Sequence, residues 1–195
     1  MKDSISVPQK GKTDAPRFAQ PERLDDIVFI PTPLTEMPAM VVSALELNRS
    51  LERDLTDLPV PDTFGETLRV DHADGTKTFI GSMRVPTPDT TIDVAYFMDF
   101  VEGEIACTSE LVHPAGESSM SRWTETKEEK FEHKGIAERQ LGLLNWYSLL
   151  RFKSALYSHP RAQEAGIGLW EKLVRTHRAE AIKLPSGDTR YRFLK

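Results

Sequence analysis

Residues Phe131 to Lys172 read FEHKGIAERQLGLLNWYSLLRFKSALYSHPRAQEAGIGLWEK, and this stretch decides the fold. From Gly135 to Leu150 the chain would be apolar on almost every side of a helix, which predicts a deeply buried helix. The segment Phe152 to Ser158 is predicted to form a central strand that ends before Pro160. A second helix with one apolar stripe follows. A loop, helix, strand and helix in this order can present backbone amides to a phosphate.

Gly135 lies directly before the first of these helices. Glycine adopts positive φ readily and lets a ligand approach the backbone closely. The start of a helix adds unpaired amides and the positive end of the helix dipole. Together these features favour a phosphate or pyrophosphate at Lys134 to Ala137, whereas the carboxylates of Glu132 and Glu138 oppose it. The alternative is an ordinary glycine-containing loop that enters a buried helix.

The second helix contains Gly166 and Gly168, and each costs about 1 kcal/mol relative to alanine inside a helix. Close packing against another element would explain why they are present. Close approach of a ligand is the other explanation.

Length and composition favour one globular unit with a tail. The chain has 195 residues, of which 39% are hydrophobic and 28% charged, so it can bury a core. Residues 1–22 carry few large apolar groups and are predicted to be a flexible tail, which leaves 23–195 as a single domain. The lone Cys107 fits a reducing compartment, and the sequence shows neither a membrane span nor a secretory signal, so we expect a cytoplasmic protein.

Upstream of the central stretch, the pattern predicts a strand, a helix and then several more strands. Ile27 to Ile30 is a short apolar strand, and a helix capped by Thr35 follows and ends at Leu58 to Pro61. Apolar residues recur along that helix at three- and four-residue steps and predict one buried face: Met37, Met40, Val41, Ala44, Leu45, Leu47, Leu51 and Leu55.

The middle of the chain carries strand signals. A turn at 73–75 separates strands around 68–70 and 78–80, and the pair Glu102-Gly103 joins strands at 92–101 and 104–112 in a tight hairpin. Residues 114–121 have the composition of a loop. The charged segment 122–134 fits either a strand or an exposed loop. At the C-terminus, 179–184 and 189–194 form a predicted hairpin with Tyr191 and Phe193 on one face.

This order of elements resembles the GNAT superfamily of N-acetyltransferases. The family's acyl-CoA loop is patterned Gln/Arg-x-x-Gly-x-Gly/Ala, and residues 132–137 read EHKGIA. A second family motif, Asn-x-x-Ala-Ile-x-Leu-Tyr-Glu-Lys, has the spacing of residues 163–172, which read QEAGIGLWEK. The resemblance covers the chain from Phe131 onward and extends upstream only through the order of elements. It implies an α+β fold of three layers, in which helices flank a mixed, mostly antiparallel sheet.

The resemblance also implies a chemistry: transfer of an acetyl or related acyl group from acetyl-CoA or another acyl-CoA to an amine on a small molecule or a protein. Glu110 and Glu104 are candidate bases on the middle strands. Because the indole of Trp170 stands where the family has a tyrosine, Tyr157 is the candidate acid, with Ser158 or a reaction that needs no acid as the alternatives. The residues implied to hold the acyl-CoA are His133, Lys134, Gly135, Ile136, Ala137, Gln163 and Trp170.

Glu132 and Trp170 depart from the family pattern and favour a second hypothesis. It is a catalytically inactive GNAT-like binding or assembly protein, which resembles divergent members from phages and mobile elements. The C-terminal segment from Arg151 to Lys195 contains ten Lys and Arg but four Asp and Glu, although the whole chain has a net charge of −5. This basic segment is compatible with contact with nucleic acid. The five histidines lack the spacing of a metal site.

Overall fold

The computed structural model describes residues 27–56, 59, 61, 64–132, 134–160 and 164–194. The predicted tail, residues 1–22, lies outside these described residues. Within them, no helix is long and apolar enough to cross a membrane.

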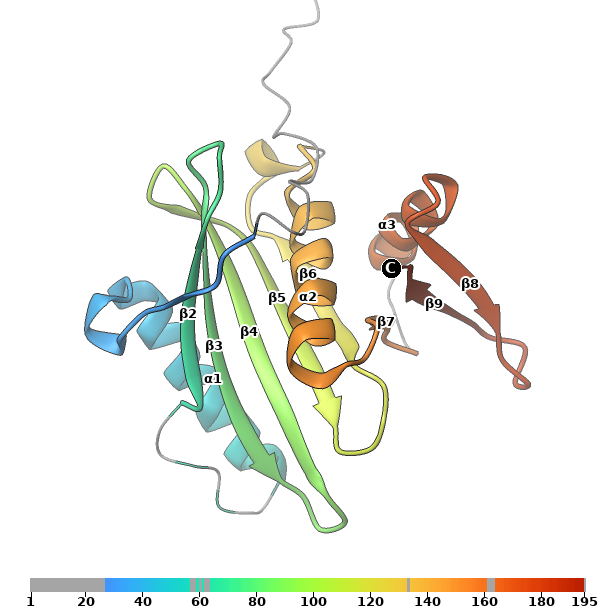
Figure 1. Ribbon diagram of the computed structural model, residues 1–195, viewed down its shortest axis with the longest axis horizontal. Coiled ribbons are helices and arrows are strands. Elements are labelled where there is room, and N and C mark those ends of the chain that lie inside the picture. Colours follow the sequence, from blue (N-terminus) through green and yellow to red (C-terminus); the bar gives the residue numbers. More distant parts are fainter. Residues whose placement is uncertain are drawn as a thin grey trace, which may run out of the picture.

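The fold is built on one nine-stranded sheet with the order β1-β2-β3-β4-β5-β6-β7-β9-β8 (Figure 1). Neighbouring strands are antiparallel except β6 and β7, which are parallel. The strands are β1 (Ile30–Pro31), β2 (Glu66–Asp71), β3 (Lys77–Pro86), β4 (Thr91–Val101), β5 (Glu104–Pro114), β6 (Met120–Thr126), β7 (Tyr157–Ser158), β8 (Ala179–Lys183) and β9 (Thr189–Phe193). The predicted mixed, mostly antiparallel sheet is therefore confirmed, and so are both hairpins.

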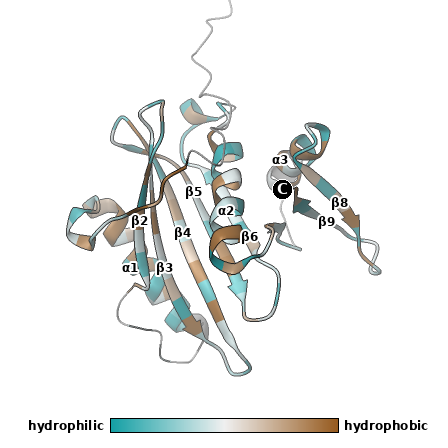
Figure 2. Cartoon of the chain, viewed as in Figure 1, coloured by the Kyte–Doolittle hydropathy of each residue, from teal (hydrophilic) through white to brown (hydrophobic). Residues whose placement is uncertain are grey.

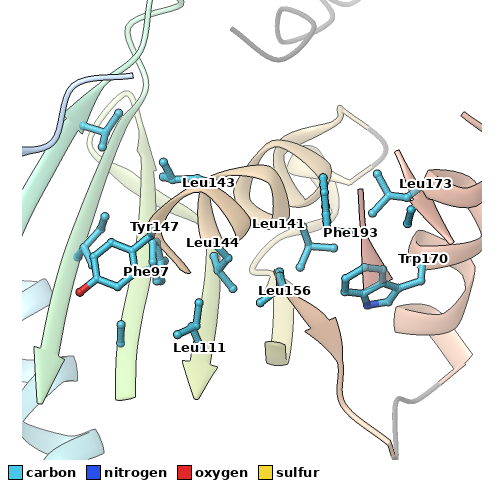
Figure 3. Close-up of a cluster of buried hydrophobic side chains, with 14 of the residues drawn as sticks. Phe97, Leu111, Leu141, Leu143, Leu144, Tyr147, Leu156, Trp170, Leu173 and Phe193 are labelled. Atoms are coloured by element: carbon cyan, nitrogen blue, oxygen red, sulfur yellow. The ribbon is translucent and has the colours of Figure 1, made fainter. Parts of the chain in front are cut away.

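Among the described residues, three α-helices flank the sheet: α1 (Ala39–Thr56), α2 (Ile136–Phe152) and α3 (Glu164–Arg175). On one face, Val41 and Leu45 of α1 pack against alternate residues of β3 and β4. On the other face, α2 and α3 share a second core cluster with the sheet. Figure 3 shows this cluster running from Phe97 and Leu111 through the leucines of α2 to Trp170 and Phe193. Successive side chains of a strand point to opposite faces, so the sheet presents apolar side chains to α1 on one face and to α2 and α3 on the other. The fold therefore has three layers: helix, sheet and helices.

Helix α2 is buried almost all round, as its sequence predicts, because it lies across the middle of the sheet. The prediction of a strand from Phe152 to Ser158 is wrong over most of its length. The helix continues to Phe152 and ends at Lys153, which adopts φ 57° as a left-handed C-cap. Only Tyr157 and Ser158 form strand β7. A helix that ends late leaves few residues before Pro160 to pair with the sheet.

The predicted buried face of α1 is only partly correct. Val41 and Leu45 are fully buried, but Met40, Leu47 and Leu51 are 54%, 61% and 49% exposed. The apolar positions cover more of the helix circumference than one sheet contact can bury. Figure 2 shows apolar residues along the central strands as well as on this helix.

Two glycines should respond in opposite ways to alanine. A Cβ at Gly81 would lie 2.6 Å from Cδ1 of the fully buried Leu45, so in Gly81→Ala either this side chain or α1 must shift, at an expected cost of about 1–3 kcal/mol. A Cβ at Gly168, in the interior of α3, would meet no atom within 4 Å. Gly168→Ala should therefore stabilise the protein by about 0.5–1 kcal/mol. Chemical denaturation of both variants measures the signs, and two losses of similar size would contradict this packing.

Candidate functional site

Strands β6 and β7 diverge after a very short parallel contact. Their pairing covers Met120 with Tyr157 and Ser121 with Ser158, after which β7 ends. Strand β6 continues to Thr126, paired only with β5 among the described strands. The backbone groups on its other side therefore have no strand neighbour, and such an edge can pair with an extended ligand.

A cleft of about 1060 Å³ opens at this divergence. Strand β6 forms one wall, the start of α2 and the segment before it form a second, and α3 forms a third. The described lining residues are Ser121, Arg122, Trp123, Thr124, Glu125, Thr126, Phe131, Glu132, Gly135, Ile136, Ala137, Glu138, Leu141, His159, Gly166, Gly168, Leu169, Trp170 and Lys172. Four of the seven residues implied for acyl-CoA binding thus meet in one cavity: Gly135, Ile136, Ala137 and Trp170.

The start of α2 opens into this cleft through Gly135. This residue is the N-cap with φ 84°, a left-handed conformation that favours glycine, and no side chain of the described residues caps the helix. The first helical bond runs from the amide of Arg139 to the carbonyl of Gly135, at 3.0 Å. The amides of the turn between them have no partner within the helix, so they can bind an acceptor or an anion in the cleft.

The predicted conflict between Glu138 and a phosphate is reduced by two ion pairs. The Glu138 carboxylate lies 2.6 Å from Nζ of Lys172 on α3 and 2.5 Å from Nη1 of Arg178, just before β8. These contacts hold the first turn of α2 against the C-terminal part of the fold. Glu132 is exposed and lines the cleft three residues before Gly135.

Helix α3 contributes an aromatic wall and two glycines. Trp170 is 4% exposed, and its ring stacks on Tyr191 with centroids 6.1 Å apart and lies edge-on to Phe193. Gly166 and Gly168 both line the cleft, and beyond its own helix no atom of the described residues lies within 4 Å of a Cβ at Gly168. Protein packing therefore does not explain Gly168, which leaves the ligand explanation open at this position.

A buried pair of carboxylates lies behind the β6 wall. A bulge in the β5–β6 ladder makes Arg122 the extra residue between Trp123, opposite Glu110, and Ser121, opposite Leu111. Its Nη1 lies 2.8 Å from Oε1 of Glu110 and 2.9 Å from Oε1 of Glu52 on α1. The Glu110 and Glu52 side chains are 2% and 8% exposed, whereas that of Arg122 is 39% exposed and reaches the cleft.

Burial raises the pKa of Glu110 from its ordinary 4.5 to about 7, and the nearby Glu52 carboxylate adds to the rise. Arg122 acts in the opposite direction but does not cancel the desolvation. A carboxyl with such a pKa exchanges protons near neutrality, which suits a general base. Glu110 does not itself line the cleft, and its contact with a residue of the described lining is the ion pair with Arg122.

None of the three predicted catalytic residues lines the cleft, whereas four of the predicted binding residues do. Glu104 lies at the exposed start of β5, where it pairs with Lys130, and does not line the cleft. Tyr157 lies beside Arg190, whose guanidinium is 4.4 Å from the centre of its ring, and is also outside the lining. Lys134 precedes Gly135 in the chain but is not among the described lining residues. His133 and Gln163 lie outside the described residues.

Sequence reasoning missed several residues of the site. Glu52 belongs to α1, far from β6 in sequence, and Arg122 lies in the segment that fitted either a strand or a loop. His159 lines the cleft directly after β7. The bulge that directs Arg122 toward Glu110 depends on a mismatch between two strands, and no local pattern encodes it.

Cys107 is buried, as expected for a structural thiol. Its Sγ donates to Oε1 of Gln140 on α2 at 3.0 Å, and burial raises its pKa well above the ordinary value. The thiol therefore remains protonated and helps to hold α2 on β5.

No family model matches the chain, and no curated protein matches it at a significant level.

Proposed function

We propose that this chain is a GNAT-like N-acyltransferase whose cleft holds an acyl thioester on a pantetheine arm, as in acetyl-CoA. The observation that carries the proposal is the divergence of β6 and β7 with the uncapped start of α2 opening between them. An extended arm with amide groups can pair with the open edge of β6, and a phosphate at its end can bind at the amides after Gly135.

The connections of the sheet support this proposal. Helix α2 links β6 to the parallel strand β7, and α3 links β7 to a hairpin whose second strand, β9, lies between β7 and β8. This is the order of elements through which the sequence resembles the GNAT superfamily. The cleft lies at the one parallel pair of the described sheet, one strand before the order departs from the sequence at β7–β9.

The proposed reaction is attack of an amine nitrogen on the thioester carbonyl, with loss of the thiol. Glu110 is the proposed proton acceptor because its pKa lies near 7 and its carboxylate adjoins the β6 wall. Since Arg122 covers it, proton transfer requires this side chain to move or a water to bridge the two sides.

A second candidate, a GNAT-like binding or assembly protein without catalysis, is favoured by Trp170. Its indole cannot act as an acid, and none of the described residues that line the cleft is a tyrosine. Two of the C-terminal arginines are engaged within the fold, because Arg190 lies over Tyr157 and Arg192 pairs with Glu180, and these two add less to contact with nucleic acid.

Both candidate functions assume that the cleft binds a pantetheine arm, and thermal unfolding in the presence of pantetheine compounds tests this assumption. Acetyl-CoA or S-acetyl-4′-phosphopantetheine at about 100 times Kd should add about 2.7 kcal/mol of stability, because each binds only the folded chain. For a chain of this size that raises Tm by roughly 5–11 °C. If neither compound at millimolar concentration shifts Tm, the cleft does not hold a pantetheine arm. Release of free thiol with a panel of amines, or its absence despite binding, then separates the two candidates.

A further inference from the structure

The charges that line the cleft are unfavourable for a nucleotide. Two cations, Arg122 and Lys172, face three carboxylates, Glu125, Glu132 and Glu138, so the described lining carries a net negative charge. Both cations are already engaged, and so are two of the three carboxylates, because Glu125 pairs with Lys127 and Glu138 pairs with Lys172 and Arg178. Arg122 bridges Glu52 and Glu110, and Lys172 pairs with Glu138 at 2.6 Å.

Coenzyme A carries a pyrophosphate and a further phosphate on its ribose, each of which adds negative charge at neutral pH. A site for three phosphates normally gathers arginines and lysines or several oriented amides. Here the described residues around Gly135 offer one helix start and three cations, Lys134, Lys172 and Arg178, of which the last two are paired with Glu138. Glu132, exposed in the same lining, would repel a second phosphate.

The rest of the lining suits a neutral chain with amide groups. Hydroxyl side chains come from β6, through Ser121, Thr124 and Thr126, and apolar side chains come from α2 and α3. The open backbone edge of β6 adds donors and acceptors beyond Ser121. The cleft therefore fits the pantetheine arm and a single phosphate better than it fits the adenine nucleotide.

From this charge pattern we infer that the donor is an acyl-phosphopantetheine thioester without the adenine nucleotide. This inference rests on the proposed function and narrows its donor. The same chemical group occurs as a free small molecule and as the arm of a carrier protein, in which the phosphate is a diester of lower charge. In either form one phosphate lies at the start of α2 and the thioester lies deeper in the cleft.

Calorimetric titration with coenzyme A, 3′-dephospho-coenzyme A, 4′-phosphopantetheine and pantetheine tests the inference. 4′-Phosphopantetheine should bind at least as tightly as coenzyme A, removal of the 3′-phosphate should strengthen binding, and pantetheine should bind about 10-fold more weakly than its phosphate. Because repulsion is screened by salt, the affinity for coenzyme A should rise between 20 and 200 mM salt. Coenzyme A binding 10-fold or more tightly than 4′-phosphopantetheine would overturn the inference and leave the proposed function standing. If none of the four compounds binds, both fail.

Two variants show whether the charge of the lining is the cause. Glu132→Lys should raise the affinity for coenzyme A by about 10-fold and change that for pantetheine little, since pantetheine has no phosphate. Glu117→Lys makes the same charge change at an exposed residue in the β5–β6 turn, outside the described lining, and should leave both affinities near wild type. Equal gains from both variants would contradict a local effect of Glu132.

A carrier protein bearing the acetylated arm distinguishes the two sources. If it binds more tightly than free S-acetyl-4′-phosphopantetheine, the carrier supplies contacts of its own and is the donor. If it binds more weakly, the walls of the cleft exclude the carrier and the free thioester is the donor. Binding of neither form would overturn the inference.

Discussion

Replacing Gly135 by glutamate should weaken binding of pantetheine phosphates at least 100-fold. With φ at 84° and no atom within 4 Å of a Cβ, the new side chain would project into open space at the start of α2. Its carboxylate would compete for the amides that a phosphate needs and would repel the phosphate directly. The left-handed backbone costs an L-residue about 1–2 kcal/mol, so a modest loss of stability should accompany the loss of binding.

Gly103→Glu is the matched control for this variant. Gly103 has φ 86° in the β4–β5 hairpin, also with no atom within 4 Å of a Cβ, and it does not line the cleft. Both variants should lose similar stability in chemical denaturation, whereas only the first should lose ligand affinity in calorimetry. Gly135→Asn, which tolerates the left-handed conformation, should retain more binding than Gly135→Glu. Equal ligand affinity in the two glutamate variants would remove the start of α2 from the site.

The sequence predicts those parts of the molecule that local patterns encode. Alternating strands at 92–101 and 104–112 with Glu102-Gly103 between them became a hairpin, because turn chemistry and strand pattern agree there. The N-cap role of Gly135 was also readable, since a glycine before an apolar helix has few other uses. These local features explain why four of the implied binding residues, from Gly135 to Trp170, meet in the cleft.

Features that depend on distant contacts were not predictable. The Glu52–Arg122–Glu110 cluster joins α1, β6 and β5, and it exists only because a bulge moves Arg122 across the ladder. The apolar pattern of α1 likewise could not show that Met40 and Leu47 remain exposed, since periodicity gives a face but not what covers it. The two candidate bases, which were chosen from their strand positions alone, therefore lie in different surroundings. Glu110 is buried next to Arg122 of the cleft, whereas Glu104 is exposed.

Arg122→Met should destabilise the protein by about 3 kcal/mol at pH 8, because it leaves two buried carboxylates facing one another. This value lies at the lower end for a broken buried ion pair, since Arg122 is itself partly exposed. For a chain of this length the loss corresponds to roughly 6–12 °C in Tm. Glu52 also fastens α1 to the sheet through this contact, so α1 should loosen first.

The same variant should be much less destabilised at pH 5. The pKa of Glu110 is raised in the folded state from 4.5 to about 7, so its carboxyl binds a proton more readily there than in the unfolded chain. A raised folded pKa contributes stability below the unfolded pKa and loses it as pH rises through the folded pKa. Without Arg122, which lowers the pKa of Glu110, the rise should be larger. The penalty of the variant must therefore grow from pH 5 to pH 8.

Two further variants separate charge from packing as the cause. Arg84→Met removes an exposed arginine that pairs with Asp93 at 3.0 Å, and it should cost about 0–1 kcal/mol at both pH values. Adding Glu110→Gln to Arg122→Met removes one of the two carboxylates and should restore much of the stability at pH 8. Denaturant titrations at pH 5 and pH 8 measure all of these differences. The loss of stability in Arg122→Met could instead be independent of pH and unchanged by Glu110→Gln. Arg122 would then stabilise the fold through its aliphatic stem. That result would contradict a pKa near 7 for Glu110.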